Sequence, residues 1–114
     1  MQRVLGACSP HGSGSARAWV YLDNLAWAMG VPSFEGPLTL EQSARLGRAI
    51  GRIVAHEVIH AVAPAVEHAR SGVMSPRFDR SDLLCVHLPV DDATRRGVLA
   101  VLALARASSM PPRS

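Results

Sequence analysis

The chain has 114 residues, of which 48% are hydrophobic and 18% are charged, and its formal net charge is +3. This length and composition predict one folded domain, residues 1–114, and exclude an intrinsically disordered chain. No apolar run approaches the roughly 18 residues of a transmembrane segment. The basic residues, all arginine, are scattered among few aromatics, so no nucleic-acid surface is expected either.

The N-terminal part of the chain predicts two short strands. Residues 3–8 form a short apolar run, and residues 9–15, rich in Gly and Ser, form a flexible loop. Residues 16–23 alternate in polarity and are expected to form the second strand. Residues 24–29 either extend that strand or begin a helical turn, and residues 30–38 contain two prolines and predict a connector.

A long helix should follow, from residue 40 to about residue 61. Thr39 with Gln42 three residues later is a capping-box pattern. Pro64 lacks an N–H and disfavours helix in the residue before it, so the helix should end between residues 61 and 63. A buried stripe is expected at the apolar positions that recur every three or four residues: Leu46, Ile50, Ile53, Val54, Val58 and Ala61.

The C-terminal part predicts an irregular segment and a final helix. Residues 73–89 have no clear period, and Ser75-Pro76 favours a turn. The last helix should begin near Asp91 or Asp92 and run to about residue 107, followed by a frayed tail over residues 108–114.

The long helix carries the string His56-Glu57-Val58-Ile59-His60, which is HExxH. Residues four apart lie on the same face of a helix, so both imidazoles can bind one ion. Glu57 then lies beside a zinc-bound water, where a carboxylate can act as general base. The motif therefore indicates a zinc hydrolase.

A third ligand is needed, because a catalytic zinc takes three protein ligands and keeps one position open. His68 follows His60 after seven residues, and the break at Pro64 lets this loop turn back toward the helix. Glu67 is the alternative third ligand, but the preference of zinc for imidazole favours His68.

The string HEVIHAVAPAVEHARSGVM, residues 56–74, resembles the metzincin clan of zinc metallopeptidases, and most closely its small bacterial zincins. The resemblance implies that His56, His60 and His68 bind one Zn²⁺ per chain, that Glu57 is the general base, and that Met74 is the Met-turn residue. Metzincins more often have the pattern HExxHxxGxxH, whereas here the spacing from the second to the third His is eight and the glycine is absent. About two thirds of the chain is covered, more weakly outside this string.

The resemblance also implies a fold and an activity. The expected fold is α+β, a minimal metzincin-like zincin with a small, mainly antiparallel sheet packed on the active-site helix, a Met-turn and a C-terminal helix. The expected activity is that of a zinc metalloendopeptidase acting on a peptide or protein substrate. The substrate would extend along a sheet edge at residues 19–23, where Trp19 and Tyr21 are candidate substrate-binding residues and Tyr21 could donate to the developing oxyanion.

Two other functions remain open: a zinc hydrolase for a non-peptide substrate, and a non-catalytic zinc-stabilised binding module.

Cys8 and Cys85 either pair or stay free, and Cys8 also ends a lipobox-like string and could cap the zinc in a latent form. A native start at Met1 would favour the cytoplasm, whereas a lost signal would favour a secreted or lipid-anchored protein. His11 is expected to be solvated and His87 structural.

Overall fold

The structure is a computed structural model that describes residues 3–9 and 17–109. Its fold class is α+β, as predicted, with a two-stranded antiparallel sheet and helices of very different length. Most of the expected loop at 9–15 and of the expected tail at 108–114 lies outside the described residues. The elements are, in chain order, β1 (Gly6–Cys8), β2 (Ala18–Val20), α1 (Leu22–Met29), α2 (Leu40–Val62), α3 (Arg80–Leu84) and α4 (Asp92–Ser109).

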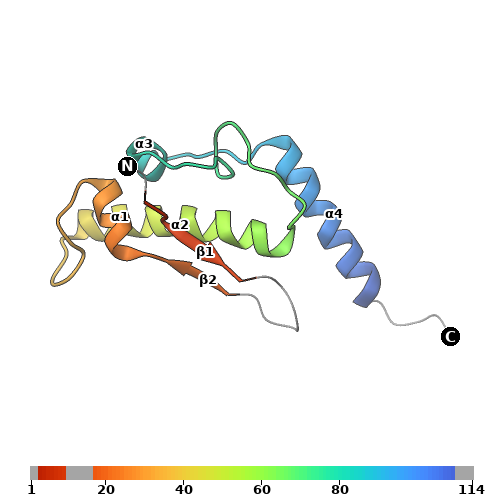
Figure 1. Cartoon of the computed structure of the whole chain (residues 1–114), viewed down its shortest axis with the longest axis horizontal. Coiled ribbons are helices and arrows are strands. Elements are labelled where there is room, and N and C mark those ends of the chain that lie inside the picture. Colours follow the sequence, from red (N-terminus) through yellow and green to blue (C-terminus); the bar gives the residue numbers. More distant parts are fainter. Residues whose placement is uncertain (1–2, 10–16, 110–114) are drawn as a thin grey trace.

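The long helix α2 is the element on which the others are arranged (Figure 1). Both strands pack against it, and so does α3. Strand β1 comes unusually close because Gly6 has no side chain: a Cβ there would lie 2.5 Å from Cγ2 of Ile53 and 3.3 Å from Cγ of Glu57. The sheet is therefore seated directly over the stretch of α2 that contains the motif.

The second strand is shorter than expected. It ends at Val20, and α1 begins at Leu22, so the prediction of a strand through residue 23 was wrong and the helical alternative for residues 24–29 is confirmed. The physical reason is packing at a helical period, since α1 buries Leu25, Ala26 and Met29 against the core. Gly30, at φ 74°, ends the helix in the left-handed conformation that glycine adopts without strain.

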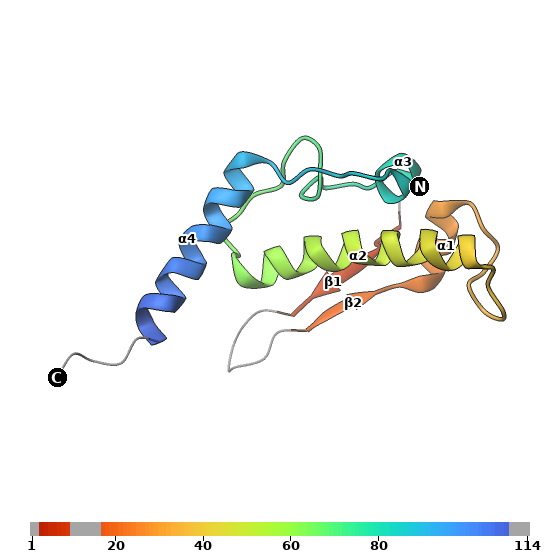
Figure 2. The same cartoon turned by 180° about the vertical axis from the view of Figure 1, so that it is seen from behind.

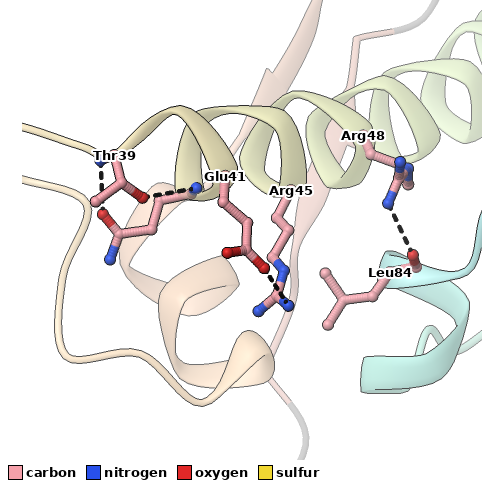
Figure 3. A network of polar contacts seen from close by, with 6 residues as sticks. Thr39, Glu41, Arg45, Arg48 and Leu84 are labelled. Atoms are coloured by element: carbon pink, nitrogen blue, oxygen red, sulfur yellow. Dashed lines mark hydrogen bonds and ion pairs between the residues drawn. The ribbon is translucent and has the colours of Figure 1, made fainter.

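The predicted boundaries of α2 are confirmed. The side chain of Thr39 accepts from the backbone N–H of Gln42 at 3.1 Å, and Gln42 accepts in return from the N–H of Thr39 at 2.9 Å (Figure 3). The helix ends at Val62, just before Pro64. The predicted stripe is only partly buried: Val54 and Val58 are 36% and 44% exposed, because a sheet of two short strands covers one side of the helix only.

Helix α3 was not expected from the sequence. Its first turn is closed by a reciprocal pair of hydrogen bonds, in which Asp79 and Asp82 each accept from the other's backbone N–H at 2.8 and 3.0 Å. Arg52 of α2, which is buried, donates to the carbonyls of Asp82 and Cys85 at the end of α3. Arg48 donates to the Leu84 carbonyl at 3.1 Å (Figure 3), so two arginines fasten α3 to α2.

The core lies against residues 46–53 of α2, between the sheet, α1 and α3. Its buried cluster consists of Leu25, Met29, Ala49, Ile53 and Leu83. Beyond the C-terminal end of α2, α4 projects away from the body of the molecule (Figures 1 and 2), and Asp91 accepts from the N–H of Thr94 at its start, as predicted. None of the helices in the described part of the chain is both long and apolar enough to span a membrane.

Candidate metal centre

Three imidazoles converge at the C-terminal end of α2. His56 and His60 lie one turn apart, and their Nε2 atoms are 3.0 Å from each other. His68 lies beyond the end of the helix, and its Nε2 is 3.0 Å from Nε2 of His60. Each residue thus offers one ligand atom, and these atoms all lie within 4.8 Å of one another. The structure therefore brings together the three histidines that the sequence singled out.

The path from α2 to His68 is a tight reversal. After α2 ends, the N–H of Val66 donates to the carbonyl of Ala63 at 3.0 Å, which makes a turn. The loop is closed further on, where the N–H of Ala69 donates to the carbonyl of Met74 at 2.8 Å. His68 immediately precedes this closure, so its position is set by the loop on both sides.

His56 is held in one orientation by the backbone. It is 8% exposed, and its Nδ1 lies 2.7 Å from the carbonyl oxygen of Val73. A carbonyl can only accept, so Nδ1 carries the proton and Nε2 of the neutral ring keeps its lone pair for a metal ion. The ring of Phe78 packs edge-on against the imidazole, with centroids 5.3 Å apart.

Met74 follows Val73 and is fully buried. The chain turns here at Gly72, whose φ is 82°, and the N–H of Val73 donates to the carbonyl of Pro89 at 2.9 Å. The same short segment thus orients His56 and buries the methionine. That Met74 forms a floor beneath the metal remains a prediction.

The charge state of His60 suits the binding of a cation. Burial lowers the pKa of His60 below its ordinary value, and the neighbouring His56 and His68 lower it further, while Glu57 opposes them. His60 is therefore neutral at pH 7, with a lone pair available.

The donor set also discriminates among metals. Three imidazole nitrogens suit zinc and other first-row transition ions, whereas magnesium and calcium prefer oxygen. Tetrahedral zinc–nitrogen bonds would separate two ligand atoms by about 3.3 Å, close to the spacing here. The three residues could therefore hold a metal ion, and the donor set alone does not choose one within the transition series.

Glu57 lies beside this cluster and lines a cavity of about 350 Å³ together with His56. Strand β1 passes next to it: burial raises the pKa of the Cys8 thiol, and the nearby carboxylate of Glu57 raises it further. Cys8 and Cys85 are both free thiols.

The remaining candidates are placed elsewhere. Trp19 and Tyr21 are exposed and do not line this cavity, so their role in binding substrate stays a prediction. Glu67 is exposed and is not part of the histidine cluster. His87 is exposed, and His11 lies outside the described residues.

The cavity is lined by three residues that sequence reasoning did not assign to the site: Arg3, Trp27 and Arg77. They come from the segment before β1, from α1 and from the segment after Met74. No local pattern marks them, because only the tertiary fold brings these segments together.

The chain was compared with models of protein families, with curated proteins and with solved structures, and nothing matched in any of the three. The resemblance to metzincins therefore rests on the sequence motif alone.

Proposed function

We propose that the protein is a zinc-dependent metalloendopeptidase with Glu57 as its general base. The observation that carries the proposal is the convergence of His56, His60 and His68 on one point, next to a cavity that Glu57 lines. Zinc bound there would acidify water and polarise a substrate carbonyl. Two ligands from one helix and a third from a reversed loop leave a side of the cluster open to substrate, as a catalytic site requires.

Glu57 is suited to move the proton. It follows His56 on α2, is half-buried, and lines the same cavity as that ligand. Its carboxylate would take a proton from the attacking water and later return it to the leaving amine, which are the two roles of a general acid–base residue. The close approach of β1 at Gly6 shields one side of this carboxylate from solvent.

The free edge of β1 supports an extended peptide as substrate. Leu5 and Ser9 use their backbone groups to bind β2, the carbonyl of Leu5 accepting from Tyr21 and the N–H of Ser9 donating to Arg17. In an antiparallel ladder the alternate residues, Gly6 and Cys8, point their N–H and C=O groups away from the partner strand. A peptide could add there as a further strand. Residues on the β1 side line the cavity, so this edge has more support as the peptide-binding edge than the edge at residues 19–23 that the sequence suggested.

The test is hydrolysis of internally quenched peptides by zinc-loaded protein. We expect cleavage within the peptide, loss of cleavage with a chelator, and recovery on adding zinc back. Glu57→Gln should keep the zinc and lose at least about a hundredfold in kcat, the usual contribution of a general base.

Two outcomes would overturn the proposal. Hydrolysis of esters but not of peptides would indicate a zinc hydrolase with another substrate. Full zinc occupancy with no hydrolysis of either would leave a non-catalytic, zinc-stabilised module.

A further inference from the structure

The cavity that Glu57 lines is formed by α2 and by three other parts of the chain. Residues 3–6 form one wall, Trp27 and Ala28 of α1 form the second, and residues 75–78 form the third. Apart from Glu57, its charged residues are Arg3 and Arg77. The cavity, at about 350 Å³, has room for a side chain but not for a folded partner.

A contact within the chain holds part of each arginine in place. The guanidinium carbon of Arg3 lies 4.8 Å from the ring centroid of Trp27, a cation–π contact that holds this side chain against the cavity wall. Arg77 is anchored through its backbone, since the hydroxyl of Ser75 donates to its carbonyl at 2.7 Å. The next residue, Phe78, packs against His56, so the position of Arg77 is tied to the metal centre.

Neither arginine forms an ion pair with an acidic side chain in the part of the chain that the structure describes. Among the described residues, the ion pairs join Arg45 to Glu41 and Arg95 to Asp92, and none involves Arg3 or Arg77. A second cavity, of about 690 Å³ and lined by His68, differs in charge, because Glu67 and Asp91 there oppose Arg70. Counting Glu57, the first cavity is lined by two positively charged residues and one negatively charged residue, whereas the second is lined by one positive and two negative. The excess of positive charge therefore lies on the Glu57 side of the cluster.

We infer that Arg3 and Arg77 form a subsite for a carboxylate of the substrate. Guanidinium groups bind carboxylates through paired, charge-assisted hydrogen bonds, which are stronger than neutral ones. The position of this subsite next to a scissile bond rests on the proposed function, whereas its affinity for a carboxylate does not. The carboxylate comes either from an Asp or Glu side chain or from a peptide C-terminus.

Binding is measured first, by the fluorescence anisotropy of labelled peptides on zinc-loaded Glu57→Gln protein, which cannot cleave them if the proposed function holds. Three otherwise identical peptides are compared: one with Glu and an amidated C-terminus, one with Gln and an amidated C-terminus, and one with Gln and a free C-terminus. We expect a carboxylate peptide to bind about tenfold more tightly than the neutral peptide, a preference that weakens as salt is raised. Which of the two carboxylate peptides binds better identifies the source.

Variants then locate the subsite. Arg3→Gln and Arg77→Gln should each reduce the preference several-fold, while Arg77→Lys should reduce it less than Arg77→Gln, because the charge is kept but the paired donors are lost. Arg96→Gln, an exposed arginine of α4 that lines neither cavity, is the matched control and should leave the preference unchanged. Equal binding of all three peptides, or a preference that survives both Gln variants, would overturn the subsite.

The same peptides, offered to protein with Glu57 intact, separate the two proposals. A preference in binding without hydrolysis of any peptide would keep the subsite and overturn the peptidase. Hydrolysis of all three peptides at equal kcat/KM would keep the peptidase and overturn the subsite.

Discussion

The carbonyl of Val73 decides which nitrogen of His56 can bind a metal ion. This carbonyl accepts a hydrogen bond from Nδ1 at 2.7 Å and so keeps the ring proton on Nδ1. The lone pair of Nε2 is then available to a metal ion. This nitrogen is the one that lies 3.0 Å from Nε2 of His60. A backbone carbonyl has no proton to donate, so the neutral imidazole of His56 adopts this tautomer.

At this scale the ligand set can be tested one side chain at a time. We expect His56→Ala, His60→Ala and His68→Ala each to weaken zinc binding by more than about a hundredfold, because loss of a ligand exceeds the effect of losing an outer hydrogen-bond partner. Metal content after dialysis against a weak chelator, measured by atomic absorption, is the readout.

His87→Ala is the control, since His87 is exposed and lies outside the cluster. Glu67→Ala should also keep the metal. Full zinc occupancy in His68→Ala, together with loss in Glu67→Ala, would transfer the third ligand to Glu67.

Among the elements, the turn at residues 72–75 connects the metal centre to the C-terminal part of the chain. Gly72 packs so tightly that a Cβ would lie 2.3 Å from the carbonyl oxygen of Pro89. The following residue both donates to Pro89 and accepts from His56. A shift of this turn would therefore move the acceptor that orients the first ligand.

Gly72→Ala should lower the free energy of unfolding by about 2 kcal/mol or more, because a left-handed conformation and a backbone clash add together. It should also weaken zinc binding, since the carbonyl of Val73 would be displaced. Denaturant unfolding and zinc titration measure the two effects.

Gly36→Ala is the matched control for this prediction. Gly36 has a φ of 83°, close to that of Gly72, but nothing lies within 4 Å of its added Cβ. Gly36→Ala should lower the free energy of unfolding by only about 1 kcal/mol, the cost of the left-handed conformation, and should leave the zinc affinity unchanged. Equal zinc affinity in the two variants would show that the turn does not position His56.

Over the whole molecule, the core packs against the first half and the middle of α2, and the metal centre lies toward its C-terminal end. The buried cluster takes Ala49 and Ile53 from this helix, whereas the two ligands that the helix carries, His56 and His60, follow in its last two turns. The loop over residues 64–71, which carries His68, contains no buried residue. A metal ion bound by His56, His60 and His68 would tie this loop to the helix.

Metal binding should therefore raise the melting temperature. At free zinc a thousandfold above Kd the stabilisation is about 4 kcal/mol. For a domain of this size that corresponds to about 10 °C or more. An unchanged melting temperature after complete removal of zinc with a chelator would contradict this expectation.

The stabilisation of the fold by zinc should also depend on pH and should decrease as the pH falls. The pKa of His60 is lowered in the folded chain, so protonation favours the unfolded state. The stability linked to His60 is thus complete above the ordinary histidine pKa of about 6.5 and is lost as the pH falls through the lower, folded value. Protons also displace the metal, so the zinc-dependent increment should be constant above about pH 7 and decline at acidic pH. Calorimetry with and without zinc between neutral and acidic pH checks the sign.

Local signals in the sequence determined α2 and the ligands on it. Thr39 with Gln42 sets the start of the helix, Pro64 sets its end, and a spacing of four places His56 and His60 together whatever surrounds them. These features depend on backbone hydrogen bonding and helical period, which act between neighbours in the chain. The same holds for Asp91 at the start of α4.

Only the tertiary structure decided the end of β2, the presence of α3 and the walls of the cavity. Residues 16–23 fit a strand by alternation, but burial of Leu25 and Met29 makes the chain helical from Leu22 onward. Arg3, Trp27 and Arg77 meet across more than seventy residues of sequence, from Arg3 to Arg77, without any shared pattern. Such contacts depend on which surfaces pack together, and that is a property of the folded chain as a whole.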